Sequence, residues 1–348
     1  MKRELLVSSL VGTFALLLAG CQTMPQNPPD NPHAVTSAKY FGKIERLDPA
    51  LDALLPRDAK IEKLGENFDW SEGPIWIKDG AYLLFSDVPM NMIYKWQEGK
   101  GVSTYFTPSG YTGTIPRGGE PGSNGLTVDS QGRVTSCEHG DRRVARLEKN
   151  GTKTTLADKY QGKRLNSPND LIYKSNGDLY FTDPPYGLVE NVKDPKKELA
   201  FQGVYRVTPN GDITLLTDEL TRPNGLAFSP DEKTLYIAVS DPDKAVWMAY
   251  DVKPDGTLGK GRVFFDSTSL VKGRKGLPDG MKVDEKGNLF ATGPGGIFIF
   301  SPDGKHLGTI NTGQATANCA WGEDGSVLYI CADMYIARLK TSTRGKMP

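Results

Sequence analysis

Apolar runs of strand length, separated by turn residues, recur along most of this chain. The clearest set follows Asn224 and occupies residues 226–228, 234–239, 245–250 and 262–265. Val, Ile, Tyr and Phe are frequent in these runs, and turns rich in Pro, Asp and Gly separate them. Each such set predicts four β-strands. Amphipathic helical patterns are nearly absent, apart from a brief one over 49–55.

One short phrase precedes each set of strands: a polar residue, usually followed by Gly, stands just before the first apolar run. The polar residues of this phrase are Glu72, Asn124, Asn169, Asn224, Asp279 and, more weakly, Asn318. Successive ones are 39 to 55 residues apart, close to the roughly 40 to 50 residues of a four-stranded propeller blade. Six such units predict an all-β fold, a six-bladed β-propeller with four-stranded blades around a central channel.

Asn-Gly and Asp-Gly pairs occur in two contexts. Six of them lie between two strands, where a hairpin needs positive φ angles: Asn150-Gly151, Asn176-Gly177, Asn210-Gly211, Asp255-Gly256, Asp303-Gly304 and Asp324-Gly325. The polar residues of the repeated phrase instead follow a loop and precede the strand that lines a propeller channel. A turn or a cap would explain any one of them alone. Their common repeat position predicts side chains that converge on the axis.

Two carboxylates and two carboxamides at one end of a channel suit a hard divalent cation. Glu72 and Asp279 would balance the charge of Ca²⁺, and Asn169 and Asn224 would add oxygen ligands. Without a cation the two carboxylates would repel each other, and one would tend to stay protonated. Three His and no paired Cys spacing argue against a zinc site built from nitrogen and sulfur. We expect Ca²⁺, with Mg²⁺, Mn²⁺ or Zn²⁺ as alternatives in the oxygen cage.

Longer motifs surround several of these residues. They are Ser71-Glu72-Gly73-Pro74, residues 164–171 (RLNSPNDL), 181–187 (FTDPPYG), 223–231 (PNGLAFSPD) and 277–280 (LPDG). Together they resemble the gluconolactonase branch of the regucalcin-like (SMP-30/gluconolactonase) family. The resemblance runs from about Glu62 to Leu339 and covers all six units in order. It implies a six-bladed propeller of metal-dependent lactonases.

The resemblance also implies roles for individual residues. Glu72 and Asn224 match metal-binding residues of the family, and Asn169 matches an Asn close to both metal and substrate. Asp279 matches the Asp that binds the metal and is the proposed proton acceptor. We therefore expect the metal ligands to be Glu72, Asn169, Asn224 and Asp279. Asp279 is the expected catalytic base.

The implied reaction is hydrolysis of a sugar lactone, such as gluconolactone, to the aldonic acid. The metal would polarise the carbonyl while Asp279 takes a proton from the attacking water. His139 is an alternative base, because imidazole suits proton transfer at neutral pH, or else a hydrogen-bonded structural residue. Asn124, Asn169 and His139 are the expected substrate contacts. The alternative function is a non-catalytic, calcium-plugged propeller that binds a sugar acid or a protein partner.

The N-terminus predicts export and lipidation. Lys2 and Arg3 precede an apolar stretch over 5–19, which ends just before Cys21. The pattern resembles a bacterial lipoprotein signal, in which residues 1–20 are removed and Cys21 is lipidated. A plain signal anchor is the alternative, although the apolar run is shorter than the about 20 residues of a membrane span.

The rest of the chain divides accordingly. We expect residues 21–40 to form a Pro-rich flexible tether, residues 41–343 the propeller and residues 344–348 a short tail. Gln22, directly after the lipidated Cys, favours the outer membrane, so the propeller would lie in the bacterial periplasm. The stretch near Ile61 to Leu64 is expected to close the ring by adding a strand to the last unit.

Charge and cysteine content narrow the set of partners. The chain has 42 Lys plus Arg and 42 Asp plus Glu, so no basic surface predicts nucleic-acid binding. The expected partner is a small lactone, with the membrane contacted only through the lipid anchor, and the protein is expected to be a monomer or weak dimer. Cys319 and Cys331 fall on neighbouring strands, where an oxidising compartment allows a disulfide. Their apolar context favours free thiols. Loops over 109–122 and 188–202 are expected to shape the pocket mouth.

Overall fold

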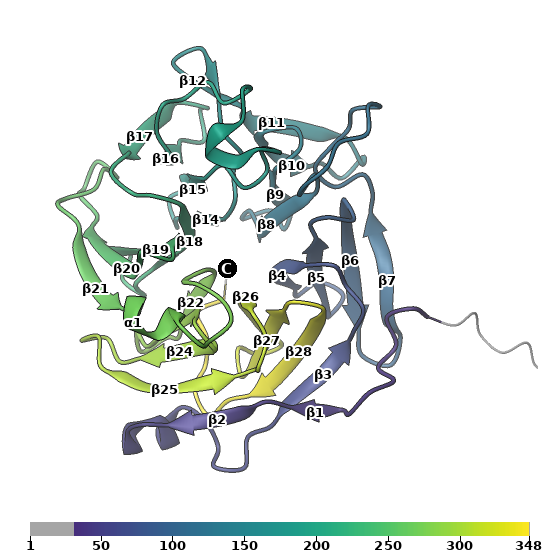
Figure 1. The fold of residues 1–348 in the computed structure, drawn as a ribbon, viewed down its shortest axis with the longest axis vertical. Coiled ribbons are helices and arrows are strands. Elements are labelled where there is room, and N and C mark those ends of the chain that lie inside the picture. The colour runs from purple at the N-terminus through teal and green to yellow at the C-terminus, as the bar shows by residue number, and fades with distance from the viewer. Residues whose placement is uncertain (1–30, 348) are drawn as a thin grey trace, which may run out of the picture. The chain divides into compact units, whose positions relative to one another are not determined.

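The computed structural model describes residues 31–347. From Pro32 onward these residues form a ring of six antiparallel sheets, the blades of a propeller, which confirms the predicted fold class (Figure 1). Within the described range, the helices are two 3-10 segments and one short α-helix: η1 (Pro49–Ala53), η2 (Asn191–Lys193) and α1 (Thr268–Val271). No helix of residues 31–347 combines the length and apolarity that crossing a bilayer requires.

The first three blades follow one another along the chain, and the first strand of each lies nearest the centre of the ring (Figure 1). Blade 1 consists of β4 (Ser71–Ile77), β5 (Tyr82–Asp87), β6 (Met92–Gln97) and β7 (Gly101–Phe106). Blade 2 consists of β8 (Ser123–Val128), β9 (Val134–Glu138), β10 (Arg143–Leu147) and β11 (Lys153–Ala157). After a small ribbon of β12 (Lys159–Tyr160) and β13 (Lys163–Arg164), blade 3 consists of β14 (Leu171–Tyr173), β15 (Leu179–Asp183), β16 (Gly203–Val207) and β17 (Ile213–Thr217).

The last three blades repeat the plan. Blade 4 consists of β18 (Pro223–Phe228), β19 (Thr234–Asp241), β20 (Lys244–Asp251) and β21 (Arg262–Asp266). Blade 5 includes β22 (Met281–Val283), β23 (Leu289–Gly293), β24 (Gly296–Phe300) and β25 (His306–Asn311), and blade 6 includes β26 (Thr316–Gly322), β27 (Val327–Ala332) and β28 (Tyr335–Lys340). The four strands of blade 4 contain the four apolar runs after Asn224, so the period and the turns were predicted correctly.

N-terminal strands complete the last two blades. β3 (Ile61–Gly65) pairs with β28 and closes the ring, as predicted; purple β3 lies beside yellow β28 in Figure 1. β1 (Tyr40–Phe41) pairs with β3, and β2 (Lys43–Arg46) pairs with β25. Blades 5 and 6 therefore have five strands instead of the predicted four. The added strands cover sheet edges that would otherwise be open to pairing.

A buried hydrogen-bond cluster holds the segment before β1 on the ring. Glu66, only 4% exposed, accepts hydrogen bonds from the backbone and hydroxyl of Thr36 at 2.8 and 2.7 Å. Lys63 Nζ lies 3.1 Å from the Glu66 carboxylate, and Ser37 Oγ also donates to it. Burial alone would raise the pKa of Glu66, but these contacts lower it to about 2. Ordered contacts thus extend to residues before Tyr40.

Aromatic packing between neighbouring blades keeps the ring rigid. Trp247 of blade 4 contacts Phe298 and Phe300 of blade 5, each with ring centroids 5.3 Å apart. Phe290 of blade 5 packs edge-on against Trp321 of blade 6 at 4.8 Å. The cysteines of the described residues are buried and free: Cys137, Cys319 and Cys331. Rigid packing of this kind gives the inner strands fixed positions around the axis.

Candidate functional site

Five of the predicted site residues line one cavity at the axis of the ring: Glu72, Asn124, Asn169, Asn224 and Asp279. Each stands in the first strand of its blade or just before it. The cavity has a volume of about 380 Å³. Its other walls are formed by Trp70, Glu120, Tyr186, Ser240, Pro242, Val271, Gly276, Leu277, Ala315 and Thr316. The common repeat position therefore brings together polar groups from five blades.

The inner strands approach each other closely at this point. A Cβ added at Gly225 would lie 2.3 Å from the Asp279 carbonyl oxygen. One added at Gly280 would lie 2.0 Å from Asn318 Cγ. Gly125 N donates a hydrogen bond of 2.8 Å to the carbonyl of Asn169, across the boundary between blades 2 and 3. The glycine of the repeated phrase thus lets neighbouring inner strands come into backbone contact, which sets the spacing of the polar side chains.

Four buried oxygens at the cavity have no hydrogen-bond partner among residues 31–347: Oδ1 of Asn124, Asn169, Asn224 and Asp279. The amide nitrogens of two of these residues are held by the protein. Asn224 Nδ2 donates to Ser240 Oγ at 2.9 Å, and Asn169 Nδ2 lies 3.4 Å from His139 Nε2. Buried polar atoms without a partner are rare and costly. Convergent oxygens of this kind fit a cation.

Burial and neighbouring carboxylates destabilise the ionised forms of Glu72 and Asp279. Burial, followed by the charge of Asp170, raises the pKa of Glu72 to about 8. Burial, followed by the charges of Glu72 and Asp170, raises the pKa of Asp279 well above its usual range. In the absence of a cation, both shifts favour the protonated forms of these carboxyls. Binding of a divalent cation would release these protons and remove the repulsion.

The donor set of this site is mixed. Nowhere in residues 31–347 do three or more His, Cys, Asp or Glu side chains form a group that could hold a metal ion. The axial site instead combines two carboxylates with amide oxygens. Hard oxygen donors of both kinds suit Ca²⁺ or Mg²⁺ better than a transition metal that prefers nitrogen or sulfur.

His139 lies directly behind the cavity wall. Its side chain is 0% exposed, and its Nδ1 is 3.2 Å from Glu120 Oε2. Its Nε2 faces Asn169, and the residue does not itself line the cavity. His139 therefore reaches the cavity only through Asn169 or Glu120. Its expected role as a substrate contact or base stays a prediction.

Two buried polar residues beneath the cavity were not assigned from the sequence. Asn318 Nδ2 donates to Glu72 Oε2 at 3.2 Å and lies 3.4 Å from Asp170 Oδ2, so it bridges the two carboxylates. Burial raises the pKa of Asp170, which is 3% exposed. The available signals were the sixth, weakest copy of the phrase for Asn318 and the position directly after Asn169 for Asp170.

The remaining predictions concern two loops, Arg164 and Cys21. Of the two loops expected at the pocket mouth, the first contributes Glu120, whereas none of residues 188–202, all of them described, lines the cavity. Arg164, which belongs to one of the motifs, donates from its guanidinium to the Asp141 carbonyl at 2.7 Å. The predicted lipidation site, Cys21, lies outside the described residues.

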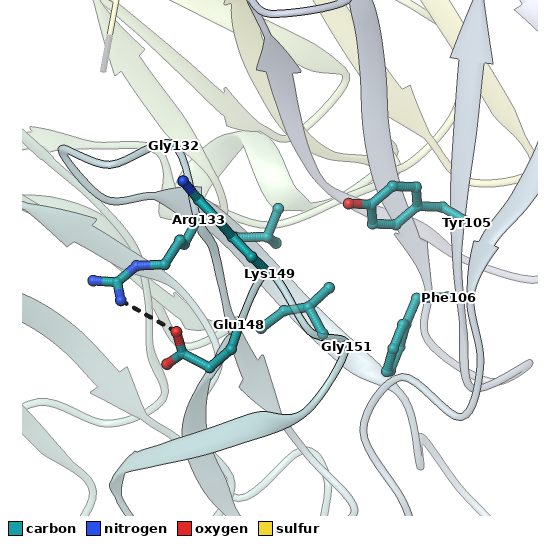
Figure 2. Close-up of a pocket in the computed structure, with 9 residues that line it drawn as sticks. Tyr105, Phe106, Gly132, Arg133, Glu148, Lys149 and Gly151 are labelled. Atoms are coloured by element: carbon teal, nitrogen blue, oxygen red, sulfur yellow. Dashed lines mark hydrogen bonds and ion pairs between the residues drawn. The ribbon is translucent and has the colours of Figure 1, made fainter.

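A second cavity, of about 310 Å³, lies between the outer strand of blade 1, β7, and the β8–β9 and β10–β11 turns of blade 2. Figure 2 shows Arg133 pointing toward Glu148 and away from Tyr105 and Phe106. The Arg133 guanidinium lies 3.1 Å from the Glu148 carboxylate, so the two side chains form an ion pair. None of the predicted site residues lines this cavity. The axial cavity is therefore the candidate functional site.

Six blades around an axial cavity with convergent oxygen donors define a β-propeller with a candidate metal site on its axis. The chain belongs to the SMP-30/Gluconolactonase/LRE-like family, whose model matches residues 70–333, and the resemblance inferred from the motifs is thereby confirmed. It is 43% identical over 313 residues to the gluconolactonase of Zymomonas mobilis, which covers 88% of each chain.

Solved structures agree with this assignment. A gluconolactonase from Xanthomonas campestris is 32% identical, with a TM-score of 0.75 over 89% of this chain and 99% of that one. A regucalcin from Agrobacterium tumefaciens, described as a calcium-binding protein, is 19% identical, with a TM-score of 0.65 over 82% of this chain and 95% of that one. The second likeness shows the shared fold alone.

Proposed function

We propose that this protein opens a sugar lactone to its aldonic acid with the help of a divalent cation held on the propeller axis. It is a hydrolase of carboxylic ester bonds, in keeping with its gluconolactonase relatives. The observation that carries the proposal is the convergence of unpartnered Oδ1 atoms of Asn169, Asn224 and Asp279 with the Glu72 carboxylate in one cavity.

The residues present fit Ca²⁺. Glu72, Asn169, Asn224 and Asp279 would hold it, and two carboxylates would balance its charge, while Mg²⁺, Mn²⁺ and Zn²⁺ are the alternatives. When bound, the cation supplies Lewis-acid polarisation of the lactone carbonyl.

Asp279 is the proposed base. Its carboxylate takes a proton from a water molecule, whose oxygen forms a bond to the carbonyl carbon of the lactone. The ring ester C–O bond then breaks, and the proton passes from Asp279 to the ring oxygen, which becomes the free hydroxyl of the acid. Asn124, Tyr186 and Ser240 line the same cavity and offer hydrogen-bonding groups to sugar hydroxyls.

The alternative is a non-catalytic propeller in which calcium acts as a plug. It needs the same ligands, so the cage alone does not separate the two functions. The lactone-hydrolysing relatives favour catalysis.

The test is a pH-indicator assay of purified protein, stripped with chelator and refilled with Ca²⁺, Mg²⁺, Mn²⁺ or Zn²⁺. We expect hydrolysis of gluconolactone or another aldonolactone to fall to background after stripping and to return with at least one metal. Metal binding by calorimetry without turnover of any lactone would instead support the plugged propeller. Full activity in the stripped protein would contradict the metal-dependent proposal.

We also propose that the protein is lipidated at Cys21 and lies in the periplasm as a monomer or weak dimer, anchored to the outer membrane. The support is the sequence pattern over residues 1–22. Metabolic labelling with a palmitate analogue should modify the wild-type protein and not the Cys21→Ser variant. Equal labelling of both would remove the lipid anchor, and light scattering would measure the oligomeric state.

A further inference from the structure

The axial cavity carries more negative charge than a divalent cation balances. Three carboxylates line it, those of Glu72, Glu120 and Asp279, whereas no Lys, Arg or His of residues 31–347 does so. Two of the three belong to the proposed metal cage, and their two charges match those of the ion. Glu120 is the third carboxylate of the lining and lies outside the proposed cage.

Backbone contacts hold Glu120 in place. It ends the loop between β7 and β8, where the residues that follow it pair with the segment after β9: Gly140 N donates to Pro121 O at 3.1 Å, and His139 N to Gly122 O at 3.1 Å. Glu120 Oε2 lies 3.2 Å from His139 Nδ1, and the side chain remains 37% exposed. The carboxylate is thus positioned by the fold and still open to the cavity.

Glu120 lines the same cavity as Glu72 and Asp279, the two carboxylates of the proposed cage. Arg117 does not line the cavity. Its guanidinium donates to the backbone carbonyls of Gly140, after β9, and Gly187, after β15.

We propose that Glu120 makes the site selective for uncharged lactones and promotes release of the carboxylate product. The proposal rests on the lactone hydrolysis proposed above. That reaction joins water to a neutral lactone and yields a hydroxy acid, which ionises at neutral pH, so the bound molecule gains a negative charge inside the cavity. Repulsion by Glu120 then weakens binding of the product but not of the substrate.

The same repulsion excludes a second class of substrate. A phosphorylated sugar lactone carries about two negative charges before it reacts. Sites that bind phosphate groups supply Arg, Lys or several backbone N–H groups. No Arg or Lys of the described residues lines this cavity. We therefore expect the cavity to bind unphosphorylated lactones and to exclude phosphorylated ones.

The test is a comparison of wild type with Glu120→Gln, both full-length and loaded with Ca²⁺. Calorimetric titration with gluconate should show about fivefold tighter binding to the variant, the size expected for two charges several ångströms apart in a wet cavity. The ratio of kcat/KM for 6-phosphogluconolactone to that for gluconolactone should rise about tenfold or more. KM for gluconolactone should change by less than about twofold, because this lactone is neutral and Glu120 does not repel it.

Two control variants separate charge from shape. Glu120→Asp keeps the charge and should keep the wild-type affinity for gluconate. Glu190→Gln removes an exposed carboxylate that does not line the cavity, and should also behave as wild type. If Glu120→Asp and Glu120→Gln shift gluconate binding equally, the effect comes from side-chain geometry and the proposal is overturned.

A measurement on the wild type alone guards against misfolding of the variant. Raising the salt concentration from about 0.01 M to about 1 M shortens the Debye length from about 30 Å to about 3 Å. Gluconate should then bind more tightly to the wild-type protein. Unchanged gluconate binding in both the salt series and the Glu120→Gln variant overturns the proposal. Absence of any lactone turnover is a separate result, which overturns the proposed function while gluconate calorimetry still tests the charge of Glu120.

Discussion

Glycine follows a polar residue in two regions of this propeller, at the hairpins and at the axis, for different physical reasons. The hairpin glycines adopt φ angles between +79° and +91°: Gly151, Gly177, Gly211, Gly256, Gly304 and Gly325. Around Gly151 and Gly211, a Cβ would meet nothing within 4 Å. Among the axial glycines, Gly125, Gly225 and Gly280 do not have positive φ, but a Cβ there would collide with the next inner strand. Gly73 has both features, a φ of +52° and a Cβ position 2.1 Å from the Asn124 carbonyl oxygen. The hairpins need glycine for its backbone freedom, whereas the axis needs it for close approach.

The largest effect should come from the acidic residues at the axis, compared with an acidic residue at a hairpin. Asp279→Ala and Glu72→Ala each remove a proposed ligand, and should lower metal affinity and lactone turnover by more than about a hundredfold, since even outer partners of metal ligands cost about 10- to 100-fold. Asp255→Ala at a hairpin, where the side chain accepts from Thr257 N at 2.9 Å, should leave both unchanged. Calorimetry and the pH-indicator assay measure these effects. Normal turnover in both axial variants would reject the mechanism.

Alanine at the glycines gives the second comparison. Gly280→Ala places a Cβ within 2.0 Å of the Asn318 side chain, which bridges Glu72 and Asp170, so overpacking should cost about 1 to 3 kcal/mol and weaken metal binding as well. Gly211→Ala has space but a φ of +90°, so it should cost about 1 kcal/mol and leave metal binding unchanged. Urea unfolding and calcium titration distinguish the two. Equal calcium affinities in both variants would remove the distinction between the regions.

Acidic groups at the axis and at the N-terminal cluster should respond to pH in opposite directions. In the metal-free protein the pKa of Glu72 is raised to about 8. Between about pH 4.5 and pH 8 the folded state therefore holds more protons than the unfolded state, and the free energy of unfolding falls as pH rises. The pKa of Glu66 is lowered to about 2, so its contribution, on the order of 2 kcal/mol, is lost as pH falls below about 4.5.

Urea unfolding followed by tryptophan fluorescence measures the free energy of unfolding across this pH range and so tests both changes, the one at acid pH and the one toward neutral pH. Saturating Ca²⁺ should reduce this decline, because the ionised axial carboxylates then bind the ion. Part of the decline should remain, since burial raises the pKa of Asp183, outside the cage, to about 7. Glu66→Gln should remove only the loss of stability at acid pH. A decline toward neutral pH that calcium leaves unchanged would show that the axial carboxyls do not cause it.

The smallest effect is expected at a hairpin asparagine. Asn150 Oδ1 accepts from Thr152 N at 3.0 Å and from Thr152 Oγ1 at 2.7 Å, both at the surface. Asn150→Ala should therefore cost about 0.5 to 1 kcal/mol of stability. Metal affinity and turnover should match the wild type. A loss of metal affinity in this variant would place a hairpin residue in the axial site.

Much of the ring could be predicted because its strands carry patterned side chains. The four runs after Asn224 and the closing strand near Ile61 contain apolar residues at the positions that become buried, so the sequence predicts them. β1 and β2 have no such pattern, because Tyr40–Phe41 is two residues long and Lys43–Arg46 is largely polar. These strands are held by backbone hydrogen bonds to existing edges, which leave little trace in side-chain pattern.

The site was predictable where it follows the repeat. Asn169, Asn224 and Asp279 share one position in their units, and that position alone brings them to the axis. Asp170 and Asn318 were not assigned, because their importance depends on which side chains pack beneath the cage, and this is set by three blades at once. The placement of Glu120 depends on the path of a long loop, which has no periodic pattern.

The proposed lactone hydrolysis requires one divalent cation bound by side chains from separate blades. The most direct measurement is anomalous diffraction from crystals of the full-length protein soaked in Mn²⁺, a stand-in for Ca²⁺ with a usable anomalous signal. We predict one strong peak in the axial cavity, with Glu72, Asn169, Asn224 and Asp279 around it at metal-to-oxygen distances of about 2.0 to 2.6 Å. An axial cavity without a peak, or a peak held by other residues, would contradict the account.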